Sequence, residues 1–229
     1  MAIEKTDVTS TNNLSGTSGT STAFLPVAGQ LYEIWVGSRH ATAAPVPTSL
    51  THSSFSAFTK VDDEGDGTLR CLSVWRGVCD LTPASEGVVV DFGASSQGCI
   101  IIRVKTYTGT NASDPVVQFK SGSGTSTTAA VTFDAATTAG NAVSAAIMFS
   151  SDSETVTWDA TMAAAGNAIS GNSQATRLYN GFVAGQEDSP SGVISSSLAF
   201  RIVAWEIAAA VAAVVGQSTS NRTTRRRRR

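Results

Sequence analysis

Short apolar runs and turn residues alternate along most of the chain. From Thr22 onward, runs of β-branched, aromatic and aliphatic residues are interrupted every 8 to 15 residues by Gly, Pro, Asn or Asp. This spacing is typical of β-sandwiches and jelly rolls, because their strands are short and are joined by tight turns. The pattern therefore predicts an all-β protein.

About twelve segments have the length and composition of strands. They are residues 21–27, 31–40, 54–61, 69–78, 87–93, 99–108, 116–122, 126–133, 142–150, 154–160, 175–184 and 197–207. This number is ample for two sheets packed face to face. We predict an antiparallel, jelly-roll-like β-sandwich, in which residues 160–173 form one short helix or a long loop and the glycine-rich residues 120–126 form a turn.

Several segments are apolar at every position instead of at alternate positions. Ile100, Ile101, Ile102 and Val104 are the clearest case. A strand with one face in water alternates between apolar and polar residues, so a continuous apolar run indicates that both faces are covered. We expect these strands in the middle of the sandwich.

The two ends of the chain differ from its middle. Residues 1–21 are rich in Ser, Thr, Asn and Gly with little to bury, which predicts a flexible or extended arm that becomes ordered only against a partner. Residues 216–229 hold six of the sixteen basic residues and no acid, which leaves ten basic and eighteen acidic residues before them. The chain thus divides into an N-terminal arm (1–21), a single β-sandwich domain (22–215) and a basic C-terminal tail (216–229). The arm and the domain together carry a formal charge of -8, and the tail carries +6.

The tail concentrates arginine. Its basic residues are Arg222, Arg225, Arg226, Arg227, Arg228 and Arg229. Guanidinium groups pair with carboxylates or phosphates through several hydrogen bonds at once. The acidic body, the lack of aromatic residues in the tail and the lack of a second basic patch argue against nucleic acid. We expect these arginines to bind an acidic surface of a neighbouring protein; nucleic acid and an artefact of expression are the alternatives.

Cysteine usage and hydrophobicity bear on the compartment. Cys71, Cys79 and Cys99 have no C-x-x-C spacing, and the first residues contain no apolar leader. We expect free, buried thiols in a protein made in a reducing cytoplasm, with a Cys71–Cys79 bridge across a hairpin as the alternative. The longest apolar run, residues 207–215, is nine residues long, whereas a membrane span needs about 20. We therefore expect no membrane association.

One acidic cluster resembles part of a calcium loop. Asp62, Glu64 and Asp66 occupy positions one, three and five of such a loop. Ser73 stands where the bidentate Glu of an EF-hand is required, and the flanking segments are strand-like, which excludes an EF-hand. The three carboxylates are weak candidates for another divalent-cation site, and a solvated hairpin tip is the alternative that we favour.

Other chemistry is sparse. His40 and His52 have no third His or Cys at zinc-ligand spacing, and no G-x-S-x-G nucleophile motif occurs. The four tryptophans lie inside predicted strands, so we expect core packing instead of an exposed platform for sugars; they are Trp35, Trp75, Trp158 and Trp205. We expect no cofactor and no enzymatic activity.

Four strand motifs carry a resemblance. They are "AFLPVAGQLYEIWVGSRH", "LRCLSVWRGV", "GCIIIRVKTYTG" and "FRIVAWEI". Through them the chain resembles small β-sandwich virion proteins of tailed bacteriophages over roughly residues 20–207. The resemblance implies a structural component of the particle, either a decoration (cement) protein of the capsid or a module of the tail or fibre.

We therefore expect a non-enzymatic capsid decoration protein that is located in the virion and made in the host cytoplasm. Its partner would be the major capsid protein or another virion protein with an acidic docking surface. It would act as a homo-oligomer whose arms bridge neighbouring subunits. One alternative is a tail or fibre module that binds host-surface glycans through loops near His40, His52 and Asp62 to Asp66. Another is a glycan hydrolase, which would need two carboxylates facing one cleft.

Overall fold

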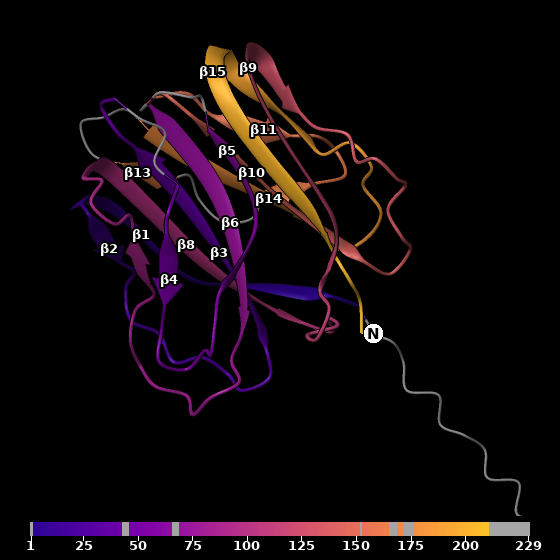
Figure 1. Cartoon of the computed structure of the whole chain (residues 1–229). Helices are drawn as coiled ribbons and strands as arrows, with labels where there is room; N and C mark the ends of the chain where they lie inside the picture. The colour runs from indigo at the N-terminus through magenta and orange to yellow at the C-terminus, as the bar shows by residue number, and fades with distance from the viewer. Residues whose placement is uncertain are drawn as a thin grey trace, which may run out of the picture.

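The computed structural model describes residues 2–42, 46–65, 69–151, 153–164, 169–171 and 176–210. These residues form antiparallel strands arranged in three sheets, with no helix among them (Figure 1). The all-β sandwich that the sequence predicts is confirmed.

The first sheet has the strand order β1-β8-β3-β6-β5. Its strands are β1 (Glu4–Gly16), β3 (Leu31–Arg39), β5 (Thr59–Gly65), β6 (Arg70–Val78) and β8 (Gln97–Thr108). Strand β3 pairs along its whole length with β6 on one side and with β8 on the other, so it forms the centre of the sheet.

The second sheet has the order β11-β15-β10-β14-β12, and β13 also pairs with β14. Its strands are β9 (Val116–Ala130), β10 (Ala142–Phe149), β11 (Val156–Trp158), β12 (Ala163–Ala164), β13 (Ile169–Gly171), β14 (Thr176–Val183) and β15 (Ser191–Ile207). Residues 200–207 pair with β10 and also with β9, so β9 forms an edge of this sheet beside β15.

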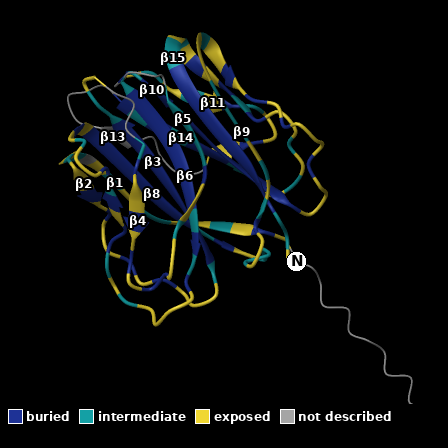
Figure 2. Ribbon diagram, viewed as in Figure 1, coloured by how far each residue is buried: buried dark blue, intermediate teal, exposed yellow. Residues whose placement is uncertain are grey.

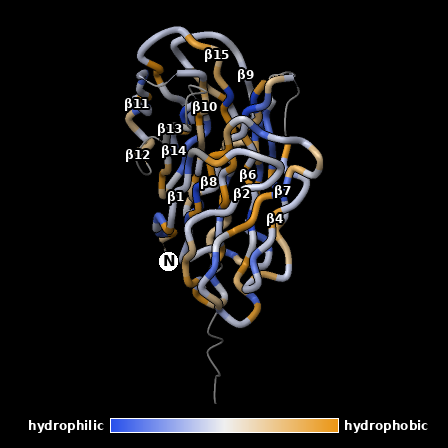
Figure 3. The backbone as a smooth tube through the Cα atoms, turned by 90° about the vertical axis from the view of Figure 1, so that its left-hand side faces the viewer, coloured by the Kyte–Doolittle hydropathy of each residue, from blue (hydrophilic) through white to orange (hydrophobic). Residues whose placement is uncertain are grey.

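The third sheet is small and has the order β2-β7-β4. Its strands are β2 (Ser18–Thr20), β4 (Ser49–Thr51) and β7 (Val89–Asp91). Figure 3 shows that the third sheet and the second sheet lie on opposite sides of the first. The first sheet is therefore the middle layer of the molecule.

This layering explains the continuous apolar runs. In β8, Ile101 and Tyr107 point to the core shared with the second sheet, while Ile100, Ile102 and Val104 point to the core under the third sheet. Both faces of the strand are thus covered, as the run predicts. Figure 2 shows the central strands buried on both faces and the exposed residues gathered in loops and edge strands.

The prediction of a flexible or extended arm that becomes ordered only against a partner is wrong for residues 4–16 and 18–20. Strand β1 pairs with β8 from Glu4 to Gly16, and β2 pairs with β7. Apolar side chains recur only sparsely here, at Ile3, Val8 and Leu14, and all three pack against the two cores. An edge strand needs few buried side chains because its backbone hydrogen bonds to a neighbour order it, and composition does not reveal this.

Strand β9 corrects a second prediction. The sequence predicts two strands, residues 116–122 and 126–133, joined by a turn, but Val116–Ala130 is one continuous strand. A Cβ at Gly124 would lie 3.3 Å from the Phe200 ring of β15, so glycine leaves the room that this ring occupies. The glycines of this stretch serve packing between strands and not a change of direction.

The remaining differences are local. Residues 21–27 contain a single bridge, from Phe24 to Glu86, instead of a strand. Residues 160–173 contain β12 and β13 and no helix among the residues described there. The short strands β2 and β4 were not predicted, because three residues are too few to form a periodic pattern.

Cysteines and tryptophans follow the predictions. All three cysteines are free and buried. Cys71 lies near the start of β6 and Cys79 directly follows its end, so the two do not face each other across a hairpin. All four tryptophans are buried, with exposed fractions of 8% or less.

Candidate functional site

The acidic cluster of β5 closes one edge of the sandwich. Asp62 accepts a hydrogen bond from Ser121 of β9, and burial raises the pKa of its carboxyl group. Asp63 pairs instead with Lys60, and Glu64 interacts electrostatically with Arg201 of β15. Of the three predicted metal candidates, Asp62 and Glu64 thus have separate protein partners, while Asp66 lies outside the described residues. Within the described part of the chain, no three His, Cys, Asp or Glu side chains converge.

The two histidines lie at opposite ends of the first sheet. The His40 backbone N–H donates to Leu69 O, beside the β5–β6 hairpin, and His40 Nδ1 accepts from Thr42 N. His52 meets Phe55 edge to face, and Phe55 contacts Tyr32 at the other end of β3. The structure therefore does not bring together the three loops that the glycan-binding alternative invoked.

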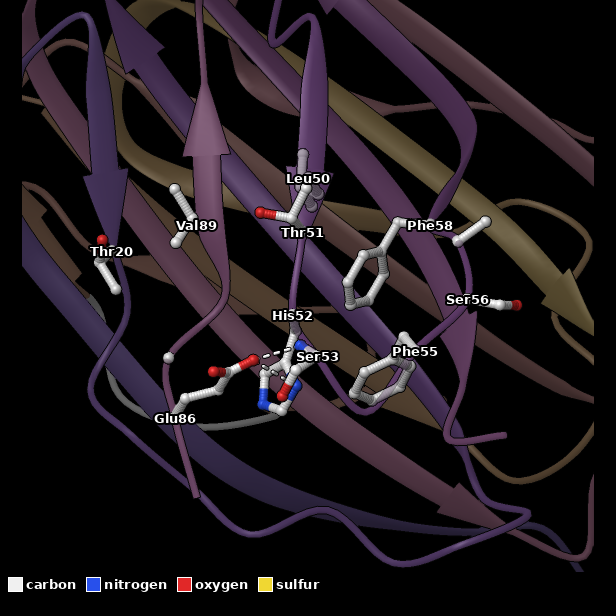
Figure 4. A pocket seen from close by; sticks show the side chains of 12 residues that line it. Thr20, Leu50, Thr51, His52, Ser53, Phe55, Ser56, Phe58, Glu86 and Val89 are labelled. Atoms are coloured by element: carbon white, nitrogen blue, oxygen red, sulfur yellow. Dashed lines mark hydrogen bonds and ion pairs between the residues drawn. The ribbon is translucent and has the colours of Figure 1, made fainter. Parts of the chain in front are cut away.

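An open cleft of about 450 Å³ lies beside the third sheet, at the His52 end. Its lining includes Thr20, Thr51, His52, Ser53, Phe55, Phe58, Glu86 and Val89. Figure 4 shows Glu86, His52 and Ser53 at one end of the cleft and the two phenylalanine rings on another side. Of these residues, only His52 was singled out from the sequence; the others belong to segments that are distant along the chain and carry no motif.

Glu86 is the one carboxylate among the residues that line this cleft. The Ser53 N–H donates to its Oε1, and this bond is the main reason that its pKa is lowered. The carboxylate is therefore charged at neutral pH, and its side chain retains 42% of its exposure. A charged, half-exposed carboxylate suits a cation or a hydroxyl group, whereas a glycosidase acid needs a raised pKa and a second carboxylate.

His52 supports this end of the cleft in its neutral form. Its Nδ1 accepts the Ser54 N–H at 3.1 Å and lies 3.3 Å from Glu86 Oε1. Burial lowers the pKa of the imidazole. Because Nδ1 is an acceptor here, the ring carries its proton on Nε2, which has no hydrogen-bond partner among the described residues.

Aromatic rings form the wall next to His52. The Phe55 and Phe58 rings stack with centroids 4.8 Å apart, and Phe55 meets Tyr32 edge to face at 5.2 Å. Phe58 covers Gly77 of β6, where a Cβ would lie 2.7 Å from the ring. This wall is therefore fixed against the first sheet, and its half-buried Phe58 ring lines the cleft.

A second polar cluster lies between the first two sheets and has no opening in the described structure. Glu33 of β3 accepts a hydrogen bond from Trp205 Nε1 of β15 at 2.5 Å and another from the Tyr107 hydroxyl at 2.7 Å. Lys105 Nζ lies 3.7 Å from Glu33 Oε2, and both side chains are fully buried. Burial lowers the pKa of Lys105 from 10.5 to about 8. Since these bonds join the two sheets, we assign the cluster a structural role: it fixes the register of one sheet on the other.

The predicted arginine site lies outside the described residues, which end at Ala210. The segment before it is held firmly: Ala208 N donates to Pro115 O and Ala210 N donates to Gly109 O, each at 2.8 Å. Gly109 also lies beside Ala2, so the two described ends of the chain lie near the same loop (Figure 1).

The described residues include no helix with the length and hydrophobicity that crossing a bilayer requires. No family model matches the chain, and comparison with curated proteins and with solved structures gave no match.

Proposed function

We propose that this protein is a non-enzymatic structural component of a bacteriophage virion, of the capsid decoration type, that attaches to neighbouring subunits through its surface and its arginine tail. The function rests on docking and not on chemistry. Its partner is the major capsid protein or another virion protein that offers acidic groups to the arginines, and it acts as a homo-oligomer.

One observation carries this proposal: several ionisable groups of the body hold its sheets together. Glu33 and Lys105 are sealed between two sheets, Asp62 accepts a hydrogen bond from Ser121 of β9, and Glu64 interacts electrostatically with Arg201 of β15. The arginine run, by contrast, comes after the last described residues, which backbone hydrogen bonds anchor at Ala208 and Ala210. A rigid body with a strongly basic extension is suited to joining surfaces, because charge-assisted pairs form when the extension docks.

The second candidate function is a tail or fibre module that binds host-surface glycans. The cleft favours it, because a carboxylate, several hydroxyl groups and a partly exposed ring line one open hollow. Such a combination can accept hydroxyl groups of a sugar and cover its apolar face. The tryptophans do not contribute, since all four are buried.

Particles that lack this protein separate the two candidates. A decoration role predicts that such particles are made, adsorb to cells normally and lose infectivity faster than complete particles on heating or on dilution into low salt. Adding back the purified protein should restore their resistance. Loss of adsorption with unchanged resistance to heat would contradict the decoration role and favour the glycan-binding module.

A further inference from the structure

The layer that covers the outer face of the first sheet carries acid and no Lys or Arg. We call it the outer layer; it comprises residues 17–30, 46–58 and 79–97, which include the third sheet and the cleft. Its acidic residues are Asp80, Glu86 and Asp91. This layer therefore presents a negative surface with no cation of its own, opposite in sign to the arginine run.

Apolar side chains are exposed on the same layer. Leu25, Val27, Leu81 and Val89 have exposed fractions between 37% and 65%, and they are four of the seven large apolar residues that are strongly exposed in the described structure. Exposed apolar groups rimmed by polar residues indicate a surface that another molecule covers. The tail, residues 216–229, contains no apolar side chain, whereas the body of a second protein offers apolar surface that can cover them.

The cleft provides a place for a guanidinium group. Glu86 is held at one end by Ser53 N–H and keeps a half-exposed carboxylate, and the Phe58 ring lies on another side (Figure 4). A guanidinium can pair with the carboxylate and stack on an aromatic face at once, a combination in which arginine exceeds lysine. Asp91 lies two residues beyond Val89 on the outward face of β7, so a second arginine of an extended chain has a further carboxylate to bind.

We propose that the outer layer is the docking surface for the arginine run Arg222–Arg229 of a second copy of this chain, so that copies associate head to tail. This inference deepens the proposed function and rests on it: it names the acidic partner of the arginines as this protein itself. Residues 211–221 can span about 35 Å when extended, which allows the run to reach a neighbouring body. A contact between two different surfaces repeats from copy to copy and produces a ring or an open array, as a lattice-bound protein requires.

A complementation experiment tests this arrangement. One variant ends after Gln217 and keeps the outer layer intact; the other keeps the arginines and carries Glu86→Gln and Asp91→Asn. Gln and Asn preserve the oxygens that accept Ser53 N–H and Gly93 N–H, so the layer should fold normally. Circular dichroism melting of each variant checks this.

Sedimentation velocity should show that the full-length protein associates at 50 mM salt and that each variant alone associates at least tenfold more weakly. An equimolar mixture of the two variants should form a one-to-one complex, which dissociates at 500 mM salt. The control carries Asp114→Asn and Asp134→Asn, two exposed carboxylates outside the outer layer, and should associate like the unaltered protein.

Three results would overturn the inference. They are no association of the full-length protein, no complex in the mixture, and association that the Glu86 and Asp91 changes leave intact. Binding of a glycan in the cleft, together with association that loss of the tail leaves unchanged, would likewise overturn it. Attachment to particles distinguishes this failure from failure of the proposed function. If the protein does not self-associate but needs its tail to attach to particles, the proposed function stands and only this inference fails. If the protein self-associates but does not attach to particles, the proposed function is contradicted.

Discussion

Glu33→Gln should lower the free energy of unfolding by about 3 to 5 kcal/mol, because it removes the negative charge that Lys105 faces in the sealed space between the first two sheets. Lys105 Nζ has no hydrogen-bond partner among the described residues and lies 3.7 Å from the Glu33 carboxylate. Arg103, also buried, gains its electrostatic stabilisation in part from the same carboxylate. Urea denaturation at pH 7, followed by tryptophan fluorescence, measures the change.

The double variant Glu33→Gln, Lys105→Met provides the control. Removing both partners of a buried pair is far less costly than removing one, so most of the lost stability should return. Asp134→Asn, which breaks an exposed pair with Lys120, should cost less than about 1 kcal/mol. A Glu33→Gln protein of unaltered stability would contradict the structural role that we assign to this cluster.

Stability should rise with pH above neutrality through Lys105. Burial lowers its pKa from 10.5 to about 8, so below pH 8 the folded protein carries the full cost of a buried charge. Between about pH 8 and pH 10.5 the unfolded chain holds a proton that the folded chain has released, and raising the pH therefore favours the folded state. The gain between pH 7 and pH 9 is about 1 kcal/mol.

Other groups act in the opposite direction and must be separated from Lys105. Burial raises the pKa of Cys71 to about 12 and that of Cys99 to about 11. Above the ordinary thiol pKa of 9.0 the thiols of the unfolded chain ionise while those of the folded chain stay protonated, so the free energy of unfolding falls as the pH rises. The difference in unfolding free energy between the unaltered protein and Lys105→Met cancels these terms. That difference should change with pH between 7 and 9; a constant difference would show that Lys105 is not buried as a charge at neutral pH.

The sequence predicted the burial of strands from whether apolar and polar side chains alternate along them. Ile100, Ile101 and Ile102 predicted a strand covered on both faces, and the third sheet provides the second cover. The sequence was uninformative where backbone bonds alone create order. Strand β1 is polar along most of its length and is fixed by pairing with β8, so its composition resembles that of a free arm.

The cleft could not be predicted for a different reason. Glu86 follows an irregular stretch and Phe55 precedes β5 by a few residues, and nothing in either segment indicates that they meet. Their proximity depends on how the third sheet lies on the first, which is a property of the tertiary fold. His52 was visible as a residue type, but its neutral state follows from the Ser54 N–H that it accepts. The buried pair of Glu33 and Lys105 was likewise hidden, because charged residues within strands usually face water.

The described residues form a three-sheet body with an acidic, partly apolar outer layer, and the sequence carries a run of arginines beyond them. Two sheets are joined through a buried charge cluster, which gives the body one fixed shape. The outer layer and the arginines are opposite in charge, which suits repeated association between copies. Both features suit the attachment role that we propose.

Attachment of the purified protein to particles that lack it, measured across a salt series from 50 to 500 mM, tests the central claim most directly. The account predicts that truncation after Gln217 weakens attachment at least tenfold at low salt and flattens its dependence on salt, because the charge-assisted pairs of the arginines are gone. Equal attachment of the full-length and truncated proteins at every salt concentration would contradict it.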